Sequence, residues 1–163
     1  MCVPRFHHSR VERDLFHNLH LGTGKDIAGS VIVDMYERGE LEGRTEYMCM
    51  QNLWRALKLW CAKHKLSMRR GHFSLMILRS SNMSYPKISS KFKGEQVKTI
   101  LYFLHAFVPK SDCDDYVRTR AAMLFGCVNM LHILCTARRF LTNDEAKGAI
   151  SSGYLYLRSY QKL

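Results

Sequence analysis

Asp14 and His17 are the first residues in the chain whose types and spacing could support chemistry. They stand in the string Asp14-Leu-Phe-His17-Asn-Leu-His20, and residues three apart are neighbours on a helix. A carboxylate and an imidazole so placed can share a divalent metal ion, or the carboxylate can orient and charge the ring. The alternative is that His17 and His20 are polar positions of a short amphipathic helix. The spacing alone favours this alternative. If the segment is functional, Asp14 is the one catalytic candidate, and Asp14 and His17 are the candidate metal ligands.

A glycine-containing segment follows at residues 21–26, with the sequence Leu-Gly-Thr-Gly-Lys-Asp. A phosphate-binding loop of the Walker A type needs a glycine where Leu19 stands and a serine or threonine where Asp26 stands. The segment meets neither requirement. It predicts a helix start instead, with Thr23 as the N-cap and Asp26 completing a capping box.

Three acids, Asp112, Asp114 and Asp115, form a further cluster that could hold a metal ion. They fall at the expected start of a long helix, where the helix dipole stabilises carboxylates, so we interpret them as capping residues. No Ser-His-Asp or Cys-His arrangement has a local signature. The sequence therefore predicts that the chain as it stands is not an enzyme, with a divalent metal left open as a cofactor.

Positive charge is concentrated in the middle of the chain. Between residues 47 and 111 there are twelve Lys and Arg against one acid, Glu95, and the resulting excess equals the formal net charge of +11 for the whole chain. Such a stretch is typical of a surface that binds a polyanion. The alternative, a solvated helix face with a charged loop, does not explain the near absence of acids. The predicted nucleic-acid-binding residues are Arg55, Lys58, Lys63, Lys65, Arg69, Arg70, Arg79, Lys87, Lys91 and Lys93.

Aromatic residues are interleaved with these bases. Trp54 and Trp60 share the apolar stripe of a predicted helix, so we expect them to belong to the core. Tyr85 and Phe92 fall in a predicted loop and are the better candidates for stacking on bases.

Composition bounds the class of protein. The chain has 163 residues, enough for one domain, and its 47% hydrophobic and 24% charged residues are ordinary for a globular protein. The six cysteines form no CxxC pair, so we expect reduced thiols in an intracellular protein, in the nucleus first and an organelle second. No apolar run approaches 18 residues, so we expect no transmembrane segment.

Apolar periodicity predicts an all-α fold. We expect a single domain over residues 1–163, a helical bundle of about five helices with an irregular basic loop region. Residues 1–22 would be an N-terminal arm with a short helix, and residues 23–163 the bundle. The final helix is still in phase where the chain stops, so we expect a piece of a longer protein. The expected helices cover residues 11–19, 23–38, 45–65, 94–107, 112–139 and 146–163, with a short helix or strand at 73–78. We expect caps at Ser111 and Asp112 and a second capping box of Thr142 and Glu145.

The string from Asp14 to Gly22 resembles the region around the second catalytic aspartate of cut-and-paste transposases with an RNase H-like core. A D-x-x-H string followed by a Leu-Gly pair recurs in the lineage that includes CACTA-type elements. Segments 60–63, 85–91 and 137–146 are also similar to transposon-like reading frames. The resemblance implies that Asp14 is the second metal-binding acid, that Glu145 is a candidate third acid, and that the helical part is an insertion between them.

The chain departs from that family in one important respect. It has no upstream strand with a first aspartate and no evident β-sheet pattern, and a two-metal site needs acids from different elements. The resemblance therefore implies a catalytically incomplete fragment of a transposase-like, D-D-E protein of a mobile element.

Three hypotheses follow for function. The first is a DNA-binding, transposase-like helical fragment, with DNA favoured over RNA. The second is a non-enzymatic basic subunit of a large ribonucleoprotein or organellar complex, docked on RNA or on an acidic protein surface. The third is a metal-dependent hydrolase centred on Asp14, His17 and His20. The sequence leaves nucleic-acid type, sequence preference and oligomeric state open.

Overall fold

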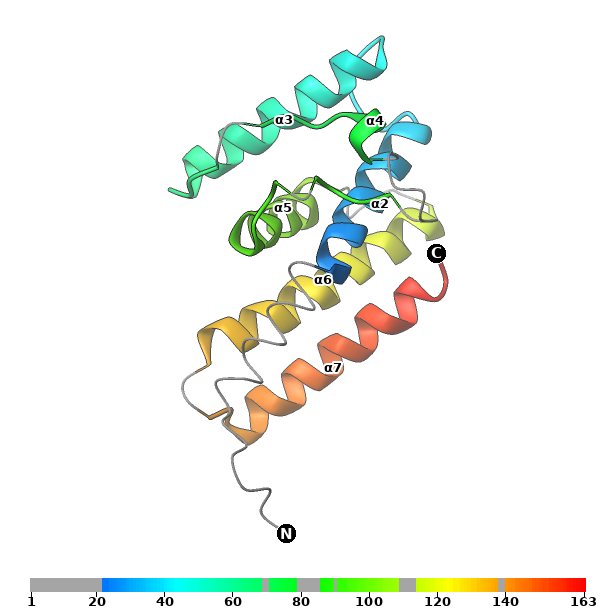
Figure 1. Cartoon of the computed structure of the whole chain (residues 1–163). Coiled ribbons are helices and arrows are strands. Elements are labelled where there is room, and N and C mark those ends of the chain that lie inside the picture. The colour runs from blue at the N-terminus through cyan, green and yellow to red at the C-terminus, as the bar shows by residue number, and fades with distance from the viewer. Residues whose placement is uncertain (1–21, 69–70, 79–85, 90, 109–113, 138–139) are drawn as a thin grey trace. The chain divides into compact units, whose positions relative to one another are not determined.

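The computed structural model describes residues 22–68, 71–78, 86–89, 91–108, 114–137 and 140–163, and within them all regular structure is helical (Figure 1). The all-α prediction is confirmed, with six helices in these ranges where about five were expected. The chain divides into two compact units, residues 1–100 and 101–163, and the prediction of a single domain stays a prediction. The helices are α2 (Gly24–Glu37), α3 (Glu46–Lys63), α4 (Leu75–Leu78), α5 (Gly94–Phe107), α6 (Asp115–Thr136) and α7 (Asn143–Tyr160).

The start of α2 differs from the expectation. Thr23 has helical backbone angles (φ −51°, ψ −36°) and its side chain makes no capping hydrogen bond. A serine or threonine caps a helix from an extended conformation, because only then can its oxygen reach back to the first free N–H groups. The predicted capping box of Thr23 and Asp26 is therefore wrong. The predicted helix at residues 11–19 lies outside the described residues.

Helices α2 and α3 end in the same way. After α2, the Gly39 N–H donates to Tyr36 O and the Glu40 N–H to Met35 O. After α3, the Lys65 N–H donates to Ala62 O and the Leu66 N–H to Cys61 O. This paired pattern is the Schellman motif, which requires a left-handed residue just beyond the helix. The left-handed residue is Gly39 (φ +70°) in the first motif and Lys65 (φ +55°) in the second.

Helix α3 starts where it was predicted to start, at Thr45, and the core of the first unit lies on the inner faces of α2 and α3. Thr45 has an extended backbone and its side chain accepts from the Met48 N–H (3.2 Å). On α3 the buried positions recur every three or four residues, as the apolar stripe predicts. The buried residues are Ile27, Ala28, Val31, Ile32, Val33 and Met35 of α2 and Cys49, Met50, Leu53, Leu57 and Cys61 of α3.

The second unit contains α6 and α7, which run side by side as a helical hairpin (Figure 1). The crossing is close because Gly126 of α6 has no side chain. A Cβ atom at this position would lie 2.7 Å from both Ser152 O and Tyr156 N. Asn129 Nδ2 donates to Ser152 Oγ (2.8 Å) across the same contact. The capping box of Thr142 and Glu145 at the start of α7 is confirmed.

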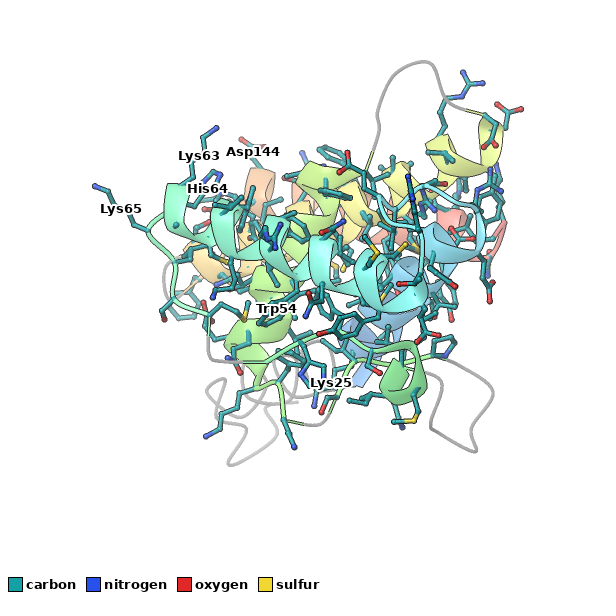
Figure 2. All side chains as sticks on the ribbon, turned by 90° about the horizontal axis from the view of Figure 1, so that it is seen from above. Lys25, Trp54, Lys63, His64, Lys65 and Asp144 are labelled. Carbon is teal, nitrogen blue, oxygen red and sulfur yellow. The ribbon has the colours of Figure 1, made fainter. Side chains whose placement is uncertain are left out.

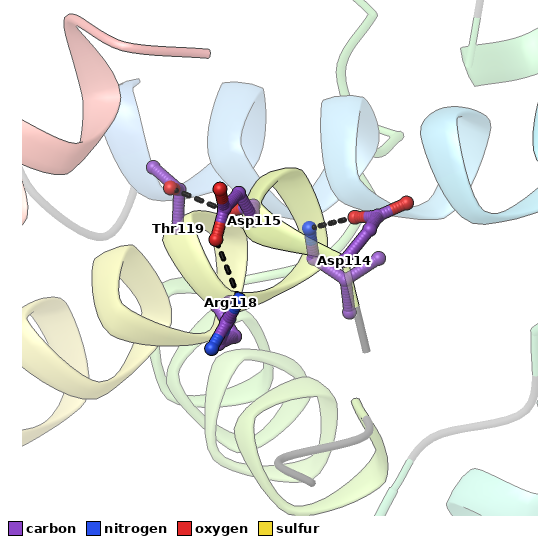
Figure 3. A network of polar contacts seen from close by, with 5 residues as sticks. Asp114, Asp115, Arg118 and Thr119 are labelled. Atoms are coloured by element: carbon purple, nitrogen blue, oxygen red, sulfur yellow. Dashed lines mark hydrogen bonds and ion pairs between the residues drawn. The ribbon is translucent and has the colours of Figure 1, made fainter. Parts of the chain in front are cut away.

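Helix α6 begins later than predicted. Its N-cap is Asp114, which accepts from the Val117 N–H (2.8 Å), while Asp115 pairs with Arg118 (2.6 Å; Figure 3). Because the cap is Asp114, the predicted caps at Ser111 and Asp112 are wrong, and both residues lie outside the described part of the chain. The interpretation of the acidic cluster as capping residues holds for Asp114, while Asp115 lies in the first turn of the helix.

Helix α6 is the one helix in the described ranges that is long and apolar enough to cross a membrane by length and composition. A buried helix of a globular protein passes the same test. In this structure Gly126 of α6 lies against the backbone of α7, and α6 also carries a buried arginine, Arg120. The expected absence of a transmembrane segment stays a prediction.

Candidate polyanion-binding surface

Seven of the ten predicted binding residues lie in the described part of the chain, and all seven are exposed. We call these seven the basic surface: Arg55, Lys58, Lys63, Lys65, Lys87, Lys91 and Lys93. All belong to the first unit. The other three, Arg69, Arg70 and Arg79, lie outside the described residues, as do Asp14 and His17 with the proposed metal site.

Helix α3 and the turn after it carry four residues of the basic surface. Arg55 and Lys58 are three apart and so lie on one flank of the helix. Lys63 and Lys65 lie at its carboxyl-terminal end, where they point away from the ribbon, while Trp54 lies midway along it (Figure 2). A cation in the last turn interacts favourably with the helix dipole, which partly explains Lys63. It does not explain the left-handed backbone of Lys65, a conformation that costs little only for glycine.

The loop before α5 carries the other three lysines, and its backbone is anchored on α2. Gly29 of α2 lies so close to Lys87 that a Cβ atom on Gly29 would be 2.4 Å from Lys87 Cα. The Ile88 N–H donates to Lys25 O (3.2 Å), the Lys87 N–H donates to Leu78 O (2.9 Å), and the Ser30 hydroxyl donates to Pro86 O (3.5 Å). These interactions hold the loop on two neighbouring helices, α2 and α4.

Side chains of this loop alternate between the core and the solvent. Ile88 is 1% exposed and Phe92 is 7% exposed, whereas Lys87, Lys91 and Lys93 are all exposed. The apolar side chains fix the loop, and the lysines project from a backbone that is already ordered. Cations held in this way lose little conformational freedom when they bind an anion.

The aromatic residues form a cluster beneath the loop. Trp54 packs edge-on against Phe73 at a ring-centroid distance of 5.2 Å, and its ring lies 6.0 Å from that of Phe92. Trp54 is half-buried and packs on two buried rings, so the expectation that it belongs to the core holds only in part. The prediction of Phe92 as a stacking residue is wrong, because its ring is buried against Trp54 and Phe73. Trp60 is half-buried and its ring lies 4.3 Å from that of His64, and Tyr85 lies outside the described residues.

A hollow of about 740 Å³ opens beside this cluster. It collects polar side chains from three segments of the first unit, and the seven residues that line it include no acid. Ser89 Oγ accepts from the Lys91 N–H (3.3 Å), and Gln96 Oε1 accepts from the Lys93 N–H (3.1 Å). The hollow therefore combines a cation with hydroxyl, imidazole and amide groups. Its lining residues are Gly71, His72, Ile77, Ser89, Lys91, Phe92 and Gln96.

Sequence reasoning missed the contribution of Ser89 and Gln96. A signal existed for Gln96, which stands three residues after Lys93 and so occupies the position from which a glutamine returns to the N–H at a helix start. No comparable pattern marks Ser89. The one acid of the basic stretch, Glu95, pairs with Lys98 (3.5 Å) and does not line the hollow.

The described residues provide no metal centre, since no three His, Cys, Asp or Glu side chains within them gather closely enough to hold an ion. Glu145, the candidate third acid, accepts hydrogen bonds from the Thr142 N–H (2.7 Å) and the Thr142 hydroxyl (2.8 Å). Its carboxylate is thus explained by helix capping. The case for a metal still depends on Asp14 and His17.

The thiols of Cys49, Cys61 and Cys127 are buried and form no disulfide. Burial disfavours the thiolate, which raises the pKa of Cys61 and raises the pKa of Cys127 to about 12. Thiols with raised pKa values are poor nucleophiles at neutral pH. Cys61 and Cys127 therefore act as packing residues.

No protein-family model matches this chain, and neither curated proteins nor solved structures include a significant match to it. The function must therefore be argued from the basic surface itself.

Proposed function

We propose that the first unit binds the phosphate backbone of a nucleic acid through the basic surface. The observation that carries this proposal is the anchored loop: Lys87, Lys91 and Lys93 are exposed while Ile88 and Phe92 between them are buried. A charged loop that served only for solubility would not need this anchoring. An ordered array of cations is suited to the regularly spaced charges of a phosphate backbone.

Binding of this kind is driven by charge and reads little sequence. Each phosphate neutralised by a lysine or arginine releases condensed counterions, so affinity falls steeply as salt rises. Because Phe92 is buried, stacking on it does not contribute. The hollow beside Lys91 supplies Ser89, His72 and Gln96 as further hydrogen-bonding groups for a phosphate or sugar. We therefore propose positioning interactions with the backbone, without base readout.

The proposal extends to the class of protein. We propose that the chain is a transposase-like helical fragment that binds DNA and is catalytically incomplete. Support comes from the D-x-x-H string at Asp14 and His17 and from the concentration of bases on the helical part. Glu145 no longer supports it, since its carboxylate caps α7.

The test is a fluorescence-anisotropy titration of labelled duplex DNA at about 50 mM and about 200 mM salt. The informative variant replaces Lys87, Lys91 and Lys93 with glutamine. Because this variant no longer neutralises three of the phosphates, the slope of log K against log salt should become shallower by about 2.7, and affinity at about 0.1 M salt should fall on the order of 100-fold.

The matched control removes the same amount of charge from the second unit. Arg118, Lys147 and Lys162 are all exposed there, and their replacement with glutamine should change affinity by less than about threefold, because only the long-range field is altered. Equal reductions of affinity in the two triple variants, or an affinity independent of salt, would disprove the proposal.

Competition distinguishes the alternative partners. Unlabelled duplex DNA, single-stranded RNA and polyglutamate are titrated against the preformed complex. We expect duplex DNA to compete best. Displacement at lower concentration by RNA or polyglutamate would instead favour a basic subunit of a ribonucleoprotein or organellar complex.

A further inference from the structure

Helix α7 presents an apolar stripe that its packing against α6 leaves exposed. Ile150, Tyr154 and Leu157 are 59%, 61% and 52% exposed. They recur at spacings of four and three, which places them along one face of the helix. Isolated exposed apolar residues are ordinary, but a continuous stripe on one helix marks an interaction surface.

The exposed stripe is distinct from the face that packs on α6. The buried face of α7 consists of Ala149, Ser152, Tyr156 and Ser159, and Gly126 of α6 lies against its backbone. The stripe borders a hollow of about 540 Å³ along the hairpin, which is lined almost wholly by apolar side chains. Those residues are Met130, Leu134, Leu141, Ala146, Ala149, Ile150, Gly153, Tyr154 and Leu157.

The charges of α7 indicate what covers the stripe. Asp144 lies in the first turn of the helix and Arg158 in the last. They are fourteen residues apart in the sequence, close to four turns of about 3.6 residues, so they lie on the same flank and about 21 Å apart along the axis. They are too distant to pair within one helix. A second helix laid alongside α7 could meet both charges at once.

An antiparallel copy of α7 supplies the opposite charges. The midpoint between Asp144 and Arg158 falls at residue 151, and the midpoint between Ile150 and Tyr154 falls at residue 152. One two-fold axis near these residues therefore brings Ile150 against Tyr154 of the second copy. The same axis brings Asp144 against Arg158 of the second copy, and the reverse. In an isologous interface every such pairing occurs twice.

We propose that the second unit is a dimerisation module in which two copies of this chain pair through antiparallel α7 helices. The two hairpins then form a four-helix arrangement, which buries the apolar stripe that a two-helix layer leaves in water. This proposal does not depend on the nucleic-acid proposal, because all of its residues belong to the second unit.

Sedimentation velocity on the full chain tests the proposal first. We expect a dimer whose population grows with concentration in the micromolar range. Ile150→Glu should raise the dimer dissociation constant by about 100-fold or more, because the symmetric interface loses the apolar contact of Ile150 in both copies. The control is Leu59→Glu on α3, which makes a similar change at a residue that is 66% exposed in the first unit; it should leave the dimer intact.

Charge exchange tests the antiparallel arrangement itself. Asp144→Arg alone and Arg158→Asp alone each place like charges in both pairs, and each should weaken the dimer by about tenfold or more. Mixed in equal amounts, the two variants form a heterodimer in which both pairs again join opposite charges. The arginine at position 144 of one chain faces the aspartate at position 158 of the other. Arg158 of the first chain faces Asp144 of the second. Affinity should return to near that of the original chain. Both reversals also oppose the helix dipole, but this effect is present before and after mixing.

Three outcomes would overturn the proposal. The first is a chain that stays monomeric up to about 100 μM. The second is a dimer that Ile150→Glu leaves as tight as Leu59→Glu does. The third is a mixture of the two charge variants that associates no better than either variant alone. Circular dichroism of each variant verifies its helical fold before the comparison.

Discussion

Replacement of Gly29 with alanine tests the close approach that orders the basic loop. In the structure, a Cβ atom on Gly29 would lie 2.4 Å from Lys87 Cα, 2.6 Å from Lys87 N and 2.7 Å from Lys87 C. Carbon atoms pack at about 3.5–4.0 Å. The neighbours are backbone atoms, which cannot rotate away as a side-chain tip can. The loop must therefore move off α2 by about 1 Å or more.

The cost follows from the interactions that such a movement breaks. Two hydrogen bonds, from the Ile88 N–H to Lys25 O and from the Lys87 N–H to Leu78 O, are worth about 0.5–1.5 kcal/mol each. The Ile88 side chain is 1% exposed, and exposing it costs about 1.5–3 kcal/mol. The higher helix propensity of alanine in α2 offsets about 1 kcal/mol of this cost. The net decrease in the free energy of unfolding should be about 1.5–5 kcal/mol.

Urea denaturation followed by circular dichroism measures this decrease, with Gly22→Ala as the control. A Cβ atom at Gly22 meets no other atom within 4 Å, so this change should leave stability within about 0.5 kcal/mol. Duplex-DNA binding by the folded Gly29→Ala variant should weaken by about threefold to tenfold, because the lysines remain but no longer have ordered positions.

Two results would refute this reasoning. Equal stability of the Gly29→Ala and Gly22→Ala variants would mean that Lys87 does not lie against Gly29. A destabilised Gly29→Ala variant that binds DNA as tightly as the original chain would mean that the anchored loop does not contribute to binding.

Three further predictions concern single sites. Lys65→Gly should stabilise the chain by about 0.5–1 kcal/mol in urea denaturation, because glycine adopts the left-handed backbone conformation without the strain that lysine has there. Gly39→Ala, at the equivalent position after α2, should destabilise the chain by a similar amount. A decrease of stability in Lys65→Gly would contradict this reasoning. Gly126→Ala, whose Cβ would meet the backbone of α7, should cost about 1–3 kcal/mol, whereas Gly148→Ala meets only a side-chain methyl group at 3.2 Å and should be neutral or stabilising. The folded pKa of Cys127 is raised from 9.0 to about 12, so the stabilising contribution of the neutral thiol is complete below about pH 9 and is lost as pH rises toward 12. Between about pH 9 and 10 the free energy of unfolding of the original chain should therefore decrease by about 1 kcal/mol more than that of Cys127→Ala. Equal decreases of the free energy of unfolding in the two chains would contradict the burial of the thiol.

The helices could be predicted wherever local signals agree. Thr45, followed by an apolar stripe that includes Met50 and Leu57, predicted α3 to within two residues at either end. Thr142 and Glu145 likewise predicted the start of α7. Thr23 has an equally good local pattern, yet its backbone is helical and it caps nothing. Capping requires a backbone conformation as well as a suitable residue, and the conformation depends on the chain before it.

The candidate site was predicted only in part. Its charges were visible because Lys and Arg can be counted, and because a stretch with one acid is unusual whatever its fold. The burial of Phe92 was not predictable, since it depends on packing against Trp54 and Phe73 from other segments. The anchoring of Lys87 on Gly29 joins two segments distant in the sequence, and no local pattern indicates it.

The sequence by itself therefore determined the helical class and the position of the positive charge, because periodicity, capping and charge act between residues close in the chain. Tertiary structure alone decided that Ile88 and Phe92 point inward while three lysines point outward. It also decided that Ile150, Tyr154 and Leu157 stay exposed after α7 has packed on α6. In both cases the question is which face of a segment is buried, and this depends on the other segments that the fold packs against it.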